Sequence, residues 1–121
     1  LSILEDAPED FEVCGPNQMT ALPMKVPVSY QEIAHCLDKS ISKIEAAVLS
    51  ALEQTPPELY ADIVKNGIYL AGGGALLRGI DKRLRDKMGI EFHVADDPLH
   101  AVARGTGIAL KNIDKFNFLI R

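Results

Sequence analysis

Apolar residues recur at every third or fourth position over residues 30–53, which is the spacing of one face of an α-helix. Ser29 and Glu32 stand at the N-cap and N3 positions, where each side chain can bind the other residue's backbone N–H. The pattern predicts a helix over Tyr30–Glu53 that packs on one face only. Its apolar stripe consists of Ile33, Leu37, Ile41, Ile44, Val48, Ala51 and Leu52, and the charged residues expected outside it are Asp38, Lys39, Lys43, Glu45 and Glu53.

The segment before this helix has weaker patterning. Residues 1–23 read as an irregular acidic connector from a preceding subdomain, and Phe11–Val13 within it is a candidate short strand. Glycine and proline in Cys14–Asn17 predict a turn. Met24–Val28 reads as a strand that lies at an edge, because Pro27 has no N–H for a ladder.

The segment after the long helix repeats a helix start signal. Thr55 is a candidate N-cap, Pro56 suits the first helical position, and Glu58 stands at N3. A shorter helix is therefore expected to run to about Lys65, and Asn66-Gly67 supplies a left-handed stop.

A strand–turn–helix–strand pattern occupies the second half of the chain. Ile68–Ala71 is a short apolar run of the kind covered on both faces of a parallel sheet. Three glycines, residues 72–74, follow it as a turn, and Ile90–Val94 alternates as a second strand. An amphipathic helix between them is marked by Leu76, Leu77, Ile80, Leu84 and Met88, with Asp81, Lys82, Arg83, Arg85 and Asp86 outside and Gly89 as its C-cap.

A last helix is expected over about Pro98–Lys111, capped by Asp97. The order strand, helix, strand, helix predicts a right-handed βαβ unit with a parallel strand pair. The tail over Phe116–Arg121 is apolar and is expected to be a docked end or a partner contact.

Composition narrows the class of protein. The net charge is −4 and no basic run occurs, which argues against nucleic acid as a partner. Cys14 and Cys36 form no CxxC pair, so both are interpreted as reduced thiols of a cytoplasmic protein. No apolar run approaches the length of a membrane span. The chain begins at Leu1 rather than at Met, and we interpret it as a fragment.

The glycine turn carries the candidate chemistry. Glycines remove side chains from the path of a ligand, so a nucleotide can lie against the backbone. A turn alone would need one glycine in a positive-φ conformation, and this chain has Gly72, Gly73 and Gly74 in a row. The P-loop is excluded because no Gly-Lys-Ser/Thr follows.

A dinucleotide fingerprint is matched only in part. Gly72 and Gly74 fit its first two glycines and Asp96 fits its acid, but Leu77 stands where a third small residue is needed. A dinucleotide-binding oxidoreductase fragment is therefore one alternative, and a ligand-free assembly module is another.

No catalytic or metal-binding constellation is predicted. The residues His35, His93 and His100 lack metal-ligand spacing with the cysteines or acids. His93 is expected on a solvent-facing or half-covered face of its strand. The last helix contains Gly105 and Gly107, which indicate close approach to another backbone or to a ligand.

Three blocks resemble one known family. Thr55–Leu59, Gly67–Gly79, and Asp97–Leu99 with Ala101–Gly107 strongly resemble MreB, the filament-forming bacterial homologue of actin. The strong resemblance covers roughly residues 55–110, and residues 27–54 fit more loosely. Gly15–Thr20 departs from the Gly-Arg-Asp pattern that is usual in the family.

The resemblance implies an α/β fold, namely part of an actin-like (ribonuclease-H-like) ATPase subdomain with helices packed on a mixed or parallel sheet. Residues 24–121 would be the C-terminal part of the second-lobe subdomain. The resemblance also implies that Ala71, Gly72, Gly73 and Gly74 contact adenosine, with Ala75 beside them. Family members usually have Thr at the position of Ala71, so the resemblance carries over backbone contacts there rather than a hydroxyl contact.

The function implied by the resemblance belongs to a longer parent. That parent binds ATP, forms cytoplasmic, membrane-associated filaments, and keeps rod shape by guiding cell-wall synthesis. Its phosphate loops and Mg²⁺ site are expected outside this chain, so we predict no ATPase activity for the chain alone. The expected partners are further copies, the cell-wall elongation machinery and the inner membrane surface.

Overall fold

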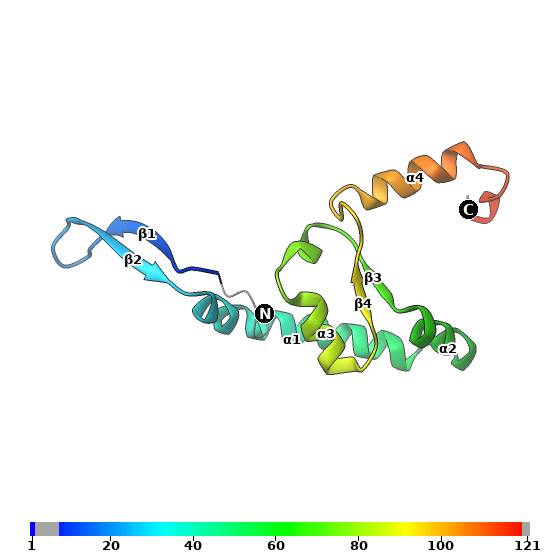
Figure 1. The fold of residues 1–121 in the computed structure, drawn as a ribbon, viewed down its shortest axis with the longest axis horizontal. Helices are drawn as coiled ribbons and strands as arrows, with labels where there is room; N and C mark the ends of the chain where they lie inside the picture. The colour runs from blue at the N-terminus through cyan, green and yellow to red at the C-terminus, as the bar shows by residue number, and fades with distance from the viewer. Residues whose placement is uncertain (2–7, 120–121) are drawn as a thin grey trace.

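The computed structural model describes Leu1 and residues 8–119. Figure 1 shows three parts: a projecting hairpin at one end, a long helix with a small α/β layer packed on it, and a helix that extends away at the far corner. The acidic residues Glu5 and Asp6 and the end of the tail, 120–121, lie outside the described residues.

The hairpin joins β1 (Phe11–Pro16) and β2 (Pro23–Val28) in antiparallel register. The strand predicted at Phe11–Val13 is confirmed and is longer, because β2 gives it a pairing partner. The turn predicted at Cys14–Asn17 is wrong: it lies over 17–22, where the Asn17 carboxamide accepts the N–H of Met19 at 2.8 Å.

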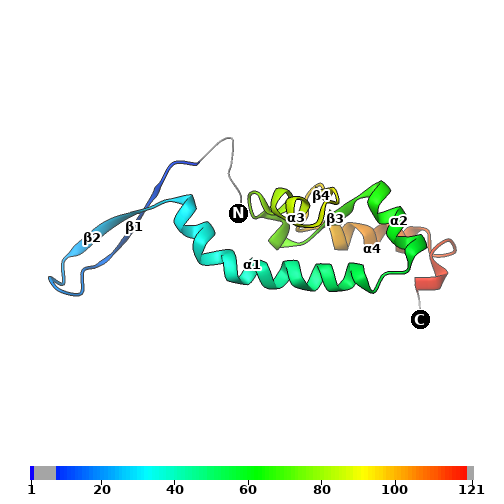
Figure 2. The same ribbon diagram turned by 90° about the horizontal axis from the view of Figure 1, so that it is seen from below.

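Helix α1 (Tyr30–Glu53) has the bounds that the periodicity predicts. Its capping box is present: Ser29 N–H donates to Glu32 Oε2 at 2.9 Å, and Glu32 N–H donates to Ser29 Oγ at 3.3 Å. In Figure 2 the α/β layer lies along one side of α1, which agrees with a one-sided apolar stripe.

Helix α2 (Pro57–Asn66) ends at Gly67 as predicted, with Gly67 N–H donating to the Ile63 carbonyl at 2.8 Å. The predicted Thr55 cap is wrong. The Thr55 hydroxyl instead donates to the Ala51 carbonyl at 2.7 Å, which gives that carbonyl in the last turn of α1 a partner. Pro56 stands at the N-cap position of α2 without a side-chain cap.

Strands β3 (Ile68–Leu70) and β4 (Phe92–Val94) pair in parallel, which confirms the predicted βαβ unit. One face of the pair packs on α1 and on α3 (Ile80–Met88). The expectation that β3 is covered on both faces is wrong, since Tyr69 is 71% exposed and its ring only meets the His93 ring at a tilt, with centroids 5.1 Å apart. No second layer of the described chain covers that face.

The core lies where α1, α3 and the small sheet meet. Its buried members are Ile41, Ile80, Leu84, Ile90 and Phe92. Gly89 ends α3 in a left-handed conformation, as predicted.

Helix α4 (Ala101–Lys111) begins three residues later than predicted. Asp97 does not cap it. This residue has φ 45°, and its carboxylate oxygens lie 3.0 Å from His100 Nδ1. Side chains added at Gly105 and Gly107 would meet nothing within 4 Å, so the close packing expected there is absent within the described chain. A short 3₁₀ helix, η2 (Asn117–Leu119), follows.

Candidate functional site

The glycine turn connects β3 to α3. Gly72 follows the strand with φ 85°, and its N–H donates to the Pro98 carbonyl at 2.7 Å. Residues Gly73–Leu76 then form a 3₁₀ helix, η1. The helix predicted to include Leu76 and Leu77 therefore starts later: Leu77 is extended and Gly79 is left-handed, so α3 begins only at Ile80.

Only the first of the three glycines is required by the backbone. Gly72 has positive φ, whereas Gly73 and Gly74 do not. A Cβ on Gly74 would meet nothing within 4 Å, and one on Gly73 would approach Leu99 Cδ2 at 3.3 Å. Turn geometry thus explains Gly72 and leaves Gly74 as an open backbone surface without an internal reason for glycine.

The predicted site residues divide between the surface and the core. Ala71, Gly73 and Gly74 are exposed, Gly72 is half-buried, and Ala75 is buried beneath the turn. Beneath the turn lies an apolar cavity of about 190 Å³, open to solvent on one side and lined by residues of β3, η1, α3 and α1. Its lining residues are Ile44, Leu70, Ala71, Gly74, Ala75, Leu77, Ile80 and Leu84.

The segment after β4 lies beside the turn. Ala95 N–H donates to the Leu70 carbonyl at 2.9 Å, and the Pro98 carbonyl accepts from Gly72. Because the carboxyl ends of parallel strands meet at one edge of a sheet, residues 95–100 border the glycines. Sequence reasoning gave the strand order but not the Gly72–Pro98 bond, for which no local pattern exists.

A partly buried ion cluster links α1 and α3 behind the turn. Arg83 Nε lies 2.7 Å from Glu45 Oε1, and Arg83 Nη2 lies 3.0 Å from Asp38 Oδ1. Glu45 is only 7% exposed, so the prediction that it lies outside the packed face is wrong. The missed signal is its position four residues after Ile41, one turn along the apolar stripe. The hydrogen bond to Glu45 raises the pKa of Arg83 above its ordinary value.

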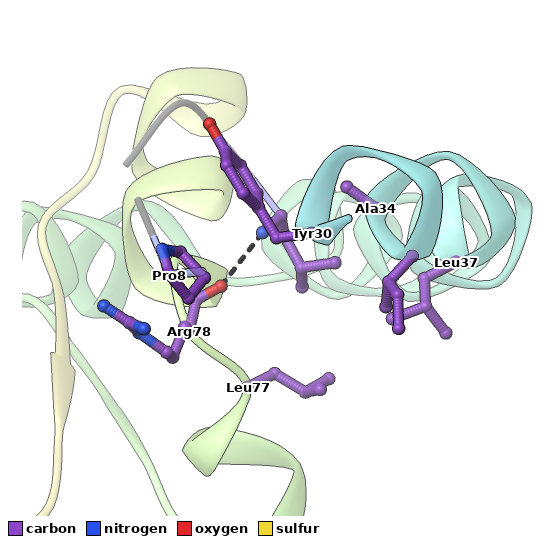
Figure 3. A pocket seen from close by; sticks show the side chains of 8 residues that line it. Pro8, Tyr30, Ala34, Leu37, Leu77 and Arg78 are labelled. Atoms are coloured by element: carbon purple, nitrogen blue, oxygen red, sulfur yellow. Dashed lines mark hydrogen bonds between the residues drawn. The ribbon is translucent and has the colours of Figure 1, made fainter. Parts of the chain in front are cut away.

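A second hollow, of about 130 Å³, lies at the start of α1 (Figure 3). Tyr30, Ala34 and Leu37 form one wall, and Leu77 forms another. The Leu1 amino group donates to the Arg78 carbonyl at 2.9 Å there. None of the residues predicted to bind nucleotide lines this hollow.

Residues 1 and 8–119 contain no group of three His, Cys, Asp or Glu side chains that could hold a metal ion. Within the same residues, no helix combines the length and apolar character that crossing a bilayer requires. Both cysteines are free and exposed.

Comparison with known proteins gives a consistent result. A family model described as MreB/Mbl protein matches residues 2–118. The cell shape-determining protein Mbl of Bacillus cereus is 44% identical over 107 residues, which cover 88% of this chain and 32% of that protein. The cell shape-determining protein MreB of Escherichia coli is 45% identical over 109 residues, covering 90% and 31%.

Two solved structures superpose on the fold. MreB5 of Spiroplasma citri bound to ADP has a TM-score of 0.85 at 38% identity, covering 95% of this chain and 35% of that one. The same protein bound to AMPPNP has a TM-score of 0.82 at 37% identity, covering 99% and 36%. The chain thus spans about a third of the length of the relatives it matches.

These likenesses define the class of protein. The α/β fold, with its parallel strand pair and glycine turn, is that of part of an actin-like protein, as the sequence predicts. Within that class the chain belongs to the MreB/Mbl family, whose relatives are cell shape-determining proteins.

Proposed function

We propose that this chain is part of an ATP-binding, filament-forming protein of the bacterial cytoskeleton, and that Ala71–Ala75 contributes its adenosine contact. The main support for this proposal is the open glycine backbone at the carboxyl end of β3, in a fold that superposes on MreB5 bound to ADP and to AMPPNP. The parent would determine rod shape by guiding cell-wall synthesis.

The turn suits a flat, largely apolar ring better than a phosphate group. Gly73 and Gly74 present bare backbone, and the cavity beneath them has apolar walls. Stacking of a base against glycine backbone needs no charged partner, and the exposed residues Ala71, Gly73 and Gly74 carry none. Phosphates and Mg²⁺ would be held by other parts of the family-length protein, since the described residues offer no oxygen-rich cluster for the ion.

The partners follow from the same proposal. Further copies of the protein, the cell-wall elongation machinery and the inner membrane surface would bind the whole protein in the cytoplasm. The net charge of −4 supports protein partners over nucleic acid.

Nucleotide titration tests this proposal. We expect the 121-residue chain to hydrolyse no ATP in the presence of Mg²⁺, and a longer protein that contains this segment to bind ATP and ADP but not NAD. Calorimetry on the longer protein measures affinity, and phosphate release on both measures turnover. Tight NAD binding would favour the oxidoreductase alternative, and absence of all three ligands would favour the assembly module.

A further inference from the structure

The Arg83 cluster lies behind the glycine turn rather than in it. Arg83 is on α3, whose first turn supplies Ile80 and whose next supplies Leu84. Those two side chains pack against Ile41 of α1 and also form walls of the 190 Å³ cavity under Gly74 and Ala75. The spacing between α1 and α3 therefore sets the shape of the cavity beneath the turn.

Apolar packing alone does not fix that spacing next to the turn. Ile44 of α1 and Gly74 and Ala75 of the turn line the same open hollow of about 190 Å³, so the packing between them is incomplete. The polar cluster bridges the same two helices. Asp38 and Glu45 lie on either side of Ile41 along α1, and both bind the single guanidinium of Arg83.

The hydrogen bonds of the Arg83 cluster have fixed directions. The planar guanidinium donates from Nε to Glu45 Oε1 at 2.7 Å and from Nη2 to Glu45 Oε2 at 3.5 Å, with Ser42 Oγ 3.4 Å from Nη2. A two-pronged contact of this kind restricts both distance and rotation between the helices, whereas apolar contacts tolerate sliding. Removing one partner would leave a charge in a largely buried place.

We propose that Arg83 is a positioning residue for the nucleotide turn: by clamping α3 to Asp38 and Glu45 of α1, it holds η1 in the conformation that binds adenosine. The inference rests on the proposed function and deepens it. Arg83 would act through α3 and would not touch the nucleotide.

The experiment must separate positioning from stability. The double variant Arg83→Met with Glu45→Met removes both buried charges together, and apolar replacement of a buried pair is often neutral or stabilising. In a longer protein that contains this segment, we expect this variant to unfold at or near the wild-type midpoint and yet to bind ADP about tenfold more weakly. ADP affinity is measured by calorimetry on protein shown to be folded by circular dichroism.

The matched control is Arg85→Met on the same helix. Arg85 faces Glu91 at 3.6 Å with both side chains exposed, so its loss should leave ADP affinity unchanged. If the double variant does not fold, Arg83→Lys gives the same readout, because it keeps the positive charge and removes the two-pronged guanidinium contact.

Two results would overturn the inference, and they differ from each other. Wild-type ADP affinity in a folded double variant or in Arg83→Lys would show that Arg83 serves stability alone, with the proposed function intact. A wild-type protein that binds no nucleotide would remove the proposed function itself.

Discussion

At the residue scale, one glycine is required by conformation and its neighbours are not. Gly72 has φ 85°, where a Cβ is unfavourable. Gly74 has an ordinary backbone conformation and open space where a side chain would stand. This difference lets a ligand role be tested without disturbing the turn.

We predict that Gly74→Val in a longer protein containing this segment weakens ATP binding at least tenfold, equivalent to about 1.4 kcal/mol. The added methyl groups would occupy the space proposed for adenosine, and the unfolding midpoint should change little. Calorimetry and thermal unfolding on the same preparation give the two quantities.

The control is Gly15→Val in β1, where an added Cβ likewise meets nothing within 4 Å. It should leave ATP affinity unchanged. Equal affinity in folded Gly74→Val protein would remove Gly74 from the site and leave the glycine run as turn chemistry.

At the element scale, the bounds of α1 follow from its N-terminal cap and from its apolar stripe. The Ser29–Glu32 box satisfies N–H groups that the first turn of any helix leaves without intrahelical partners. Helix α4 differs, because none of its residues is buried and it contains two glycines. The described chain therefore gives α4 little apolar burial to stabilise it.

We predict that Ser29→Ala lowers the free energy of unfolding of the 121-residue chain by about 1 kcal/mol. The substitution removes the acceptor of the Glu32 N–H and half of the reciprocal cap. Urea unfolding followed by circular dichroism at 222 nm measures the change.

Ser40→Ala, at an exposed position inside α1, is the matched control and should be neutral or slightly stabilising because alanine is the better helix former. An unchanged midpoint for Ser29→Ala would mean that the cap contributes nothing to the stability of α1.

At the scale of the whole molecule, apolar surface is left open. The register of the hairpin puts three apolar cross-strand pairs on one face: Phe11 with Val28, Val13 with Val26, and Gly15 with Met24. The opposite face carries Cys14 and a Glu12–Lys25 ion pair at 3.3 Å. Phe11 is 50% exposed, and the open face of the β3–β4 sheet adds Tyr69.

We predict that the 121-residue chain self-associates as its concentration rises, because bare apolar faces and free strand edges drive association. Light scattering under reducing conditions should give a mass above the 13.2 kDa of one chain. Val13→Thr with Val26→Thr should reduce that mass, whereas Cys14→Ser on the opposite face should not. A monomer at high concentration would contradict the prediction.

Local features of the fold followed from the amino-acid pattern alone. The bounds of α1, its capping box, the ends of α2 and α3 at Gly67 and Gly89, and the parallel strand pair were all predicted. Each of these features depends on hydrophobic periodicity or on the backbone preferences of a few adjacent residues. Periodicity and local backbone preferences can both be recognised in the sequence without knowledge of the fold. The resemblance of the glycine and Asp97–Gly107 blocks likewise gave the family that the comparisons confirm.

Which surfaces meet depends on long-range contacts, and these are seen only in the folded chain. Glu45 is buried because Arg83, 38 residues away, neutralises it, and Tyr69 is exposed because no layer of the described chain covers its face. Helix α3 starts later than predicted because Leu77 is extended and Gly79 is left-handed. The Asp97 carboxylate lies against His100 Nδ1 and does not cap α4. Local sequence patterns indicate the conformation that each residue prefers, whereas burial and side-chain pairing depend on partners that are distant in sequence.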